Sequence, residues 1–298
     1  MLGAASRTCR SWRSAAREPE LWRRIDLRGY SRPFRETISL DRMARLAIWF
    51  SAGQCVEFMG EHGWVDGDLL LFLAEWAPLL TSLRLPMVYR HNQAFVEAIK
   101  MFPMLEELEF CQCNDRNVTW IIRTFATCSP QLRHLKYVDR GGYLLADNRD
   151  ALEIARMHRL SSLQLFHGNL DNKGLTTIID NCPHLEYLHL HYCANVVIDS
   201  SMQAKCARIK KKKLYPYVYD DFTKYFEPGD CTSHCSSFRI NRNYGDEVDF
   251  QYLYAEDHDS VDCDHSSYFS RAEETDFEEH ERSFINGTRR RRHRYLRI

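Results

Sequence analysis

Several features that would place this chain in a common class are missing from its sequence. The longest apolar run, from Leu69 to Ala74, is far shorter than the roughly 20 residues that a membrane helix needs. The N-terminus has no uninterrupted apolar segment of a secretory signal, and Glu18 and Glu20 argue against a transit peptide. We therefore expect no membrane contact and a cytoplasmic and/or nuclear location.

Motifs of catalysis and metal binding are also missing. The sequence contains no GxxxxGK, GxGxxG, HExxH or GxSxG pattern, and none of its 11 cysteines forms a CxxC pair. We expect reduced thiols, no metal, no cofactor and no enzymatic activity. A zinc site from Cys231, His234 and Cys235 with Cys263 and His265 stays open, although its spacing matches no common finger.

A large net charge is absent too, but the near-zero total of −1 conceals two blocks of opposite sign. Residues 220–281 hold 18 acidic residues against 4 lysines or arginines, whereas residues 282–298 hold 7 arginines and no acid. Arg289–Arg294 could serve as a nuclear import signal or a nucleic-acid patch, or pair with the acidic block. Of the functions considered in this section, nucleic-acid binding is the least favoured.

The strongest signal in the chain is a repeat with a period of 25 to 28 residues. Five segments follow the pattern L-x-x-L-x-L or a close variant, and a proline stands two positions before the first anchor in four of them. The segments are 80–85, 105–110, 132–137, 160–165 and 185–190. A weaker unit is expected at Val56–Phe58, and the sheet is expected to begin at Ile25–Leu27.

Each repeat changes from helical spacing to the alternation of a short strand. Residues 69–77, 95–102, 118–125 and 175–182 place apolar side chains on one helical face, and L-x-L follows each helix. A single unit cannot bury both its helix stripe and its strand face, so stacked units share one core. The sequence therefore predicts an α/β solenoid of short parallel strands and helices in an open arc.

One repeat has a specific family resemblance. The segment GLTTIIDNCPHLEYLHLHYC, residues 174–193, resembles the cysteine-containing leucine-rich repeat found in many F-box proteins, of plant-like type. Cys182 and Cys193 fall on its cysteine positions, and Cys113 holds the place of Cys193 in an earlier repeat. The resemblance implies buried structural cysteines, so a metal role for Cys111, Cys113 or Cys193 is disfavoured.

The first residues are basic and contain two tryptophans ten residues apart. Their apolar positions favour an amphipathic helix over 3–17 that ends at Glu18-Pro19, because the residue before proline leaves the helical region. Residues 21–27 then lead into a strand. One interpretation is that the two tryptophans only cap the first strand of the solenoid.

The segment CRSWRSAAREPELWRRIDL, residues 9–27, resembles the second half of an F-box. The resemblance implies the substrate-recognition subunit of a Skp–cullin–F-box (SCF) E3 ubiquitin ligase, which binds a Skp-family adaptor and, through it, the cullin-RING ligase. It assigns adaptor contact to Cys9, Trp12, Pro19, Leu21 and Trp22. Because an F-box is about twice this length, we expect an N-terminally truncated F-box. The alternative is a protein-interaction scaffold uncoupled from the ligase.

The target is expected on the concave, strand-lined side of the arc. Side chains that alternate with the leucines point outward there, and mixed polarity favours a protein target. The predicted contacts are Arg84, Glu107, Glu109, His134, Lys136, Gln164, Tyr187 and His189. A solvated face without a ligand is the other possibility.

Three domains follow from these patterns. Residues 1–27 form the partial, helical F-box, residues 28–198 the leucine-rich-repeat domain, and residues 199–298 an acidic, then basic, tail of low order. Low aliphatic content and strong charge favour a largely disordered tail. Within it, residues 199–226 could cap the last repeat, because an array needs a shielded end.

Overall fold

The computed structural model describes residues 10–28, 40–60, 65–88, 93–112, 119–139, 148–168 and 170–215. The described residues fall into two units, residues 10–18 and residues 19–215, and each is described by itself. The first contains the helix α2 (Arg10–Ala15), within the range predicted as helical, and a turn in which Arg17 N–H donates to the Ser14 carbonyl. No described helix is long and apolar enough to cross a membrane.

The second unit is built on a parallel sheet of eight strands whose order in space is their order in the sequence. Each strand pairs with the next, which is the topology of a solenoid. The predicted α/β solenoid is therefore confirmed. Its strands are β1 (Arg24–Asp26), β2 (Glu57–Met59), β3 (Ser82–Val88), β4 (Glu107–Gln112), β5 (His134–Asp139), β6 (Ser162–Phe166), β7 (Tyr187–His191) and β8 (Lys211–Tyr215).

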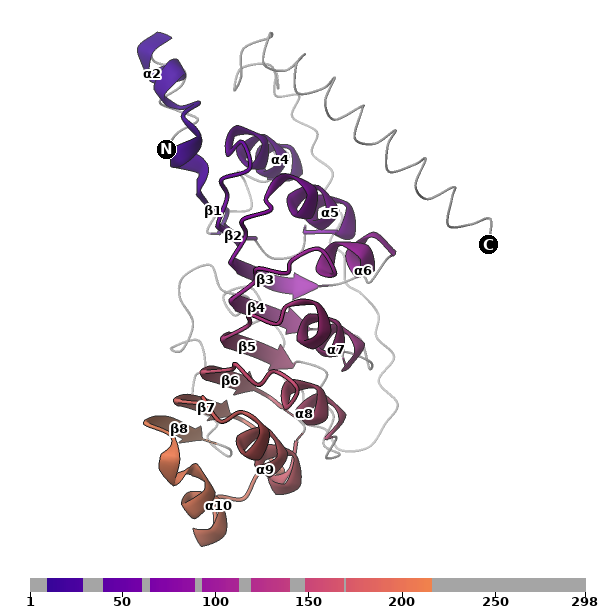
Figure 1. Ribbon diagram of the computed structural model, residues 1–298, viewed down its shortest axis with the longest axis vertical. Helices are drawn as coiled ribbons and strands as arrows, with labels where there is room; N and C mark the ends of the chain where they lie inside the picture. Colours follow the sequence, from indigo (N-terminus) through magenta and orange to yellow (C-terminus); the bar gives the residue numbers. More distant parts are fainter. Residues whose placement is uncertain are drawn as a thin grey trace, which may run out of the picture. The chain divides into compact units, whose positions relative to one another are not determined.

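Helices run between successive strands and gather on one side of the sheet (Figure 1). Asp66, Asp171 and Asp199 each cap a helix by accepting a backbone N–H three residues ahead, at 2.8, 3.0 and 2.8 Å. The helices are α4 (Leu40–Phe50), α5 (Gly67–Trp76), α6 (Gln93–Ile99), α7 (Thr119–Cys128), α8 (Arg149–Ile154), α9 (Asn172–Asn181) and α10 (Ser200–Lys205), with the 3-10 turns η1 (Pro19–Trp22) and η2 (Cys206–Arg208).

The leucine anchors lie in register between sheet and helices and form one continuous core. Leu83, Leu108, Leu135, Leu163 and Leu188 are direct neighbours along the sheet, and all are buried. Phe110 and Tyr137 occupy adjacent positions in the next row and stack with ring centroids 4.7 Å apart. Because each anchor packs on its neighbours, no repeat is stable by itself.

The array extends past residue 198, where the sequence analysis ended it. Helix α10, turn η2 and strand β8 add a final unit, and β8 pairs in parallel with β7. Met202, Cys206 and Ile209 are buried in this unit, so part of the segment considered as an end cap does shield the core. Residues 216–298 lie outside the described residues, and so do both proposed cysteine–histidine clusters and the arginine-rich end.

Candidate functional surfaces

The F-box-like stretch and the repeat array share residues. From β1 to β6 the carbonyl one position before the strand accepts two backbone N–H groups of the following repeat, as Thr81 O does from Glu106 and Glu107 at 2.8 and 2.9 Å. Arg23 O makes the same contacts with Val56 and Glu57, at 2.8 and 3.2 Å. Residues 21–27 are therefore the first repeat of the solenoid as well as the end of the F-box-like motif.

Trp22 occupies the anchor position that leucine holds in later repeats. Its ring stacks on Phe50 of α4, with ring centroids 5.6 Å apart and planes inclined by 28°. The side chain is half-buried, so its main apolar contact lies inside the array. This observation supports the interpretation that Trp22 caps the first strand of the solenoid. Removal of its side chain is therefore expected to destabilise the packing of η1 on α4.

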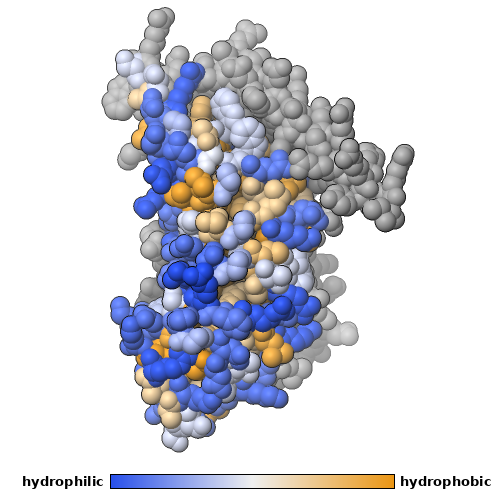
Figure 2. Space-filling view, in the orientation of Figure 1, coloured by the Kyte–Doolittle hydropathy of each residue, from blue (hydrophilic) through white to orange (hydrophobic). Residues whose placement is uncertain are grey.

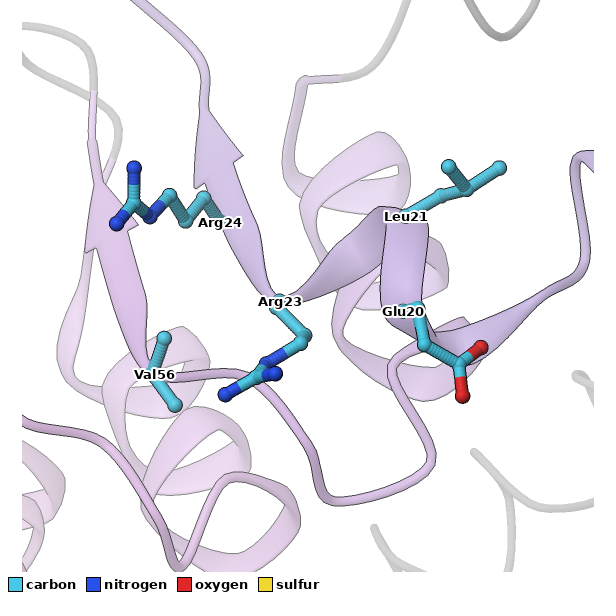
Figure 3. A pocket seen from close by; sticks show the side chains of 5 residues that line it. All are labelled: Glu20, Leu21, Arg23, Arg24 and Val56. Carbon is cyan, nitrogen blue, oxygen red and sulfur yellow. The ribbon is translucent and has the colours of Figure 1, made fainter.

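Leu21 faces solvent beside this anchor and is 48% exposed. Together with Glu20, Arg23, Arg24 and Val56 it lines a pocket of about 490 Å³. Figure 3 shows Leu21 and Glu20 projecting from η1 to different sides, with the Arg23 side chain beside Val56. An exposed leucine among charged side chains is suited to contact another protein.

The five predicted adaptor contacts have different outcomes. Cys9 lies outside the described residues, and Trp12 lies on α2, where its side chain is not described. Pro19 is half-buried at the start of η1, while Leu21 is exposed and Trp22 packs on α4. Their role in adaptor binding stays a prediction.

The second surface is the strand face, formed by the side chains that alternate with the core leucines. From β1 to β5 it carries a row of alternating charges, which we call the charge row: Arg24, Glu57, Arg84, Glu109 and Lys136. Neighbouring groups lie 3.5, 3.8, 4.0 and 2.7 Å apart along it. Because the row pairs internally, this half of the face has little charge left to attract a ligand.

Two further predicted contacts flank the charge row. Glu107 accepts a hydrogen bond from Ser82 Oγ at 3.1 Å, whereas His134 is exposed. Gln164 follows Lys136 in register on β6 and is half-buried. The predicted residues thus do lie in two adjacent rows along the strands, as the alternation indicated.

From β6 to β8 the strand face changes to aromatic rings and lysines. We call Tyr187, His189, Lys211, Lys213 and Tyr215 the aromatic–lysine cluster. The expectation that His189 points freely outward is wrong, because the side chain is only 2% exposed. Its ring lies 4.9 Å from that of Phe166, 6.4 Å from Tyr187 and 6.3 Å from Tyr215, and these large neighbours cover it.

The environment of His189 opposes protonation. Burial, followed by electrostatic repulsion of the protonated form by Lys213, His191 and Lys136, lowers the pKa of the imidazole to about 4. Burial and the nearby Tyr215 also raise the pKa of the Tyr187 hydroxyl. A buried neutral imidazole beneath cationic side chains indicates a positive potential at this end of the face.

Most cysteines of the described array are buried like apolar residues, whereas Cys128 on α7 is only half-buried. Burial raises the pKa of the Cys55 thiol to about 12 and that of Cys182 to about 11, so both are protonated and unreactive. Cys182 Sγ donates to the Met157 carbonyl at 3.6 Å, and Cys193 is fully buried. Cys113 lies outside the described residues. Among the residues that are described, no cluster of histidine, cysteine and carboxylate side chains could hold a metal ion.

Sequence reasoning missed β8 and with it three of the five residues of the aromatic–lysine cluster. A signal was present, because Ile209 and Leu214 stand 24 residues after Leu185 and Leu190. Lys212 replaces the middle leucine of the pattern, and that polar residue concealed the repeat.

Comparison with known proteins agrees with this architecture. The family described as F-box-like matches residues 1–28. "Putative F-box/LRR-repeat protein 22" of Arabidopsis thaliana is 32% identical over 263 residues, which cover 86% of this chain and 85% of the relative. The chain belongs to the F-box/LRR-repeat family. A second relative, "F-box protein SKIP19" of the same plant, is 34% identical over 72% of this chain and 70% of its own length.

Other F-box/LRR-repeat relatives extend the same pattern. "Putative F-box/LRR-repeat protein 9" of Arabidopsis thaliana is 31% identical over 66% of this chain and 81% of its own length. Among solved structures, the leucine-rich-repeat protein LegL7 from Legionella pneumophila matches with a TM-score of 0.38 and 10% identity, over 57% of this chain and 58% of that protein.

Proposed function

We propose that this protein is the substrate-recognition subunit of an SCF E3 ubiquitin ligase. The observation that carries the proposal is the direct fusion of the F-box-like match over residues 1–28 to the repeat array through the shared residues 21–27. In this role the N-terminal motif binds a Skp-family adaptor, and the strand face holds a target protein. Ubiquitin transfer is performed by the cullin-RING subunits, and the chain itself catalyses no reaction.

The short shared segment has a mechanical consequence. Pro19 to Trp22 forms a turn that passes directly into β1, and Arg23 is hydrogen-bonded to the second repeat. A segment tied to the sheet in this way cannot reorient freely relative to the repeats. We propose that it helps to fix the direction in which a bound target faces the ligase, in the cytoplasm and/or nucleus.

Leu21 offers a test that separates adaptor contact from folding. We expect Leu21→Glu in the full chain to weaken capture by a Skp-family adaptor about tenfold, because a charge replaces an exposed apolar contact. Leu79→Glu is the matched control, since Leu79 holds the equivalent position in a later repeat and is 53% exposed. The measurement is titration of each purified variant with adaptor, with thermal unfolding followed in parallel.

Two results would contradict parts of the proposal. Equal adaptor affinity for both variants would remove Leu21 from the interface. Failure of the unaltered full chain to bind any adaptor would favour the alternative, a leucine-rich-repeat scaffold uncoupled from the ligase. That alternative is supported by the packing of Trp22 on Phe50, which withdraws one apolar ring from an external partner.

A further inference from the structure

One edge of the array is formed by the tight turns that join each helix to the next strand. In the six turns that precede β3 to β8, the N–H of the apolar anchor donates to the carbonyl three residues earlier, at 2.9 to 3.3 Å. Proline is favoured at the second position of such a turn because its φ is already fixed, and four of the turns have it there. Each turn therefore holds the side chain at its third position in a defined place.

We call the side chains at the third position of these turns the turn edge. From β3 to β8 they are Leu79, Met104, Gln131, Arg159, His184 and Arg208. All are exposed except Gln131, which is half-buried. Because neighbouring strands lie about 4.8 Å apart, the six positions form a line about 24 Å long.

The turn edge is apolar beside β3 and β4. Leu79 and Met104 are 53% and 50% exposed, and Met101, in the segment between α6 and the same turn as Met104, is 38% exposed. Exposed apolar side chains that gather at one place mark a surface for another protein. Methionine suits such a surface, because its unbranched side chain adapts to the shape of its partner.

Beside β5 to β8 the same edge is basic. Arg159 donates from Nη1 to Gln131 Oε1, which directs its guanidinium along the edge toward the apolar half. Arg133, one position before β5, is exposed, and Arg208 donates to backbone carbonyls at and just beyond the end of α9. Within the described part of the chain, none of these three arginines pairs with a carboxylate.

The carboxylates near this basic half do not neutralise it. Glu186 is paired with Lys210 and Asp180 with Lys205, each at 2.7 Å, so each pair contributes no net charge. Glu106, one position before β4, is exposed and lies on the apolar side of the boundary. The turn edge thus changes from apolar to positively charged between β4 and β5.

We propose that the turn edge from β3 to β6 is the docking site for a segment of the target protein that carries apolar side chains next to carboxylates. The inference deepens the proposed role as a target receptor and rests on it. Leu79 and Met104 contact the apolar side chains, while Arg133 and Arg159 bind the carboxylates through charge-assisted hydrogen bonds. From Leu79 to Arg159 is about 14 Å, which an extended segment covers in about four residues.

A protein segment fits this edge better than a nucleic acid. Nucleic acid is held by a continuous track of phosphate contacts, whereas the part of the edge beside β3 and β4 offers leucine and methionine instead of cations. Glu106 would also repel a phosphate chain that continued across β4. A segment whose negative charge is confined to one end needs no longer track.

Two labelled peptides test the proposal on the full chain in the absence of adaptor. One carries two leucines and, about four residues further on, three glutamates, whereas its partner has glutamines in place of the glutamates. Each is made in both chain directions, because side-chain contacts do not fix the direction, and the tighter one is used. We expect the glutamate peptide to bind about tenfold more tightly than the glutamine peptide, since the arginines attract its carboxylates.

Two double variants separate the halves of the site. Arg133→Glu with Arg159→Glu should lower the affinity for the glutamate peptide by at least about tenfold, and leave that for the glutamine peptide within about twofold. Leu79→Ser with Met104→Ser should lower the affinity for both peptides by about fivefold or more, because both peptides carry the leucines.

Matched controls lie away from the turn edge. Lys173→Glu with Lys211→Glu makes the same change of charge at two exposed positions on α9 and β8. Leu152→Ser with Val197→Ser removes two apolar side chains that are 56% and 53% exposed. Both controls should leave both peptide affinities within about twofold. Equal affinity of the two peptides, or unaltered binding in either variant of the turn edge, would overturn the proposal.

Other occupants of the turn edge have their own signatures. Adaptor capture should be unaltered in all four variants, so failure of the docking site and failure of the ligase role give different results. A loss of adaptor affinity above about tenfold in the Leu79/Met104 variant would assign the edge to the adaptor. Tighter binding of a single-stranded oligonucleotide than of the glutamate peptide would assign it to nucleic acid. Either result would contradict a target segment.

The chain's own acidic block is the remaining alternative. Exchange of the carboxylates in residues 220–281 for amides within the full chain should change peptide affinity by less than about twofold. A rise above about tenfold that disappears in the Arg133/Arg159 variant would assign the turn edge to that block and contradict a target segment.

Discussion

The two halves of the strand face share one backbone geometry but differ in their side chains. From β1 to β5 the charge row pairs each lysine or arginine with a glutamate 2.7 to 4.0 Å away. From β6 to β8 rings take the place of the glutamates, while lysines remain at the edge. In the space-filling view, the end that carries β7, β8 and α10 is predominantly hydrophilic at its surface (Figure 2).

The difference teaches that position in a repeat does not by itself define a binding residue. Glu109 and His189 occupy the same row and were both predicted as target contacts. One is held between two cations, and the other is covered by three rings. Neighbours in the adjacent repeats decide whether such a residue can reach a partner.

The largest expected effect comes from Phe166, which supports the aromatic end. Phe166→Ala removes a buried ring beside His189 and His191 and should lower the free energy of unfolding by about 3 kcal/mol. Val138 is its register neighbour on β5, and Val138→Ala removes fewer atoms and should cost about 1 to 2 kcal/mol. Urea denaturation of both variants measures the contrast, and equal losses would mean that the ring cluster adds nothing to stability.

An intermediate effect is expected from the pH dependence of His189. Its folded pKa of about 4 lies below the ordinary value of 6.5, so the unfolded chain binds the proton more readily. Stability contributed by this group is present above pH 6.5 and is lost as the pH falls toward 4, by up to about 2 kcal/mol. His189→Gln should flatten the dependence of the unfolding free energy on pH over that range, which chemical denaturation at several pH values measures, and an unchanged dependence would contradict the prediction.

The smallest effect is expected at the charge row. Glu109→Gln deprives Lys136 and Arg84 of their shared carboxylate and should cost about 1 kcal/mol, because the pair with Lys136 is partly shielded from solvent. Glu186→Gln breaks an exposed pair with Lys210 and should cost about 0.5 kcal/mol or less. If chemical denaturation gave the reverse order, the charge row would be no more than a solvated surface.

Much of the fold could be predicted from the sequence because the leucine anchors recur at a fixed period. The strand positions from Ile25 to Leu190 were confirmed, because in a stacked array each apolar anchor can be buried only by facing the shared core. The last repeat was missed because Lys212 takes a leucine position and satisfies its ammonium with carbonyls instead. The spacing of apolar residues does not predict a contact between a lysine and backbone carbonyls.

The candidate site was less predictable than the fold. Alternation placed the outward residues in the right rows, but it could not show that His189 is covered or that Glu109 bridges two cations. Likewise, the tryptophan pattern gave the F-box resemblance, but only the structure showed that Trp22 stacks on Phe50 while Leu21 faces solvent. Those facts depend on α4, which the sequence analysis did not predict.

The central claim is that this chain couples a repeat array to a ubiquitin ligase. The most direct test mixes the purified full chain with a Skp-family adaptor and a cullin, and measures the mass of the assembly by sedimentation. The claim predicts one species that contains all three proteins, with the adaptor required for the cullin to join. A full chain that sediments separately from the adaptor–cullin pair would contradict it.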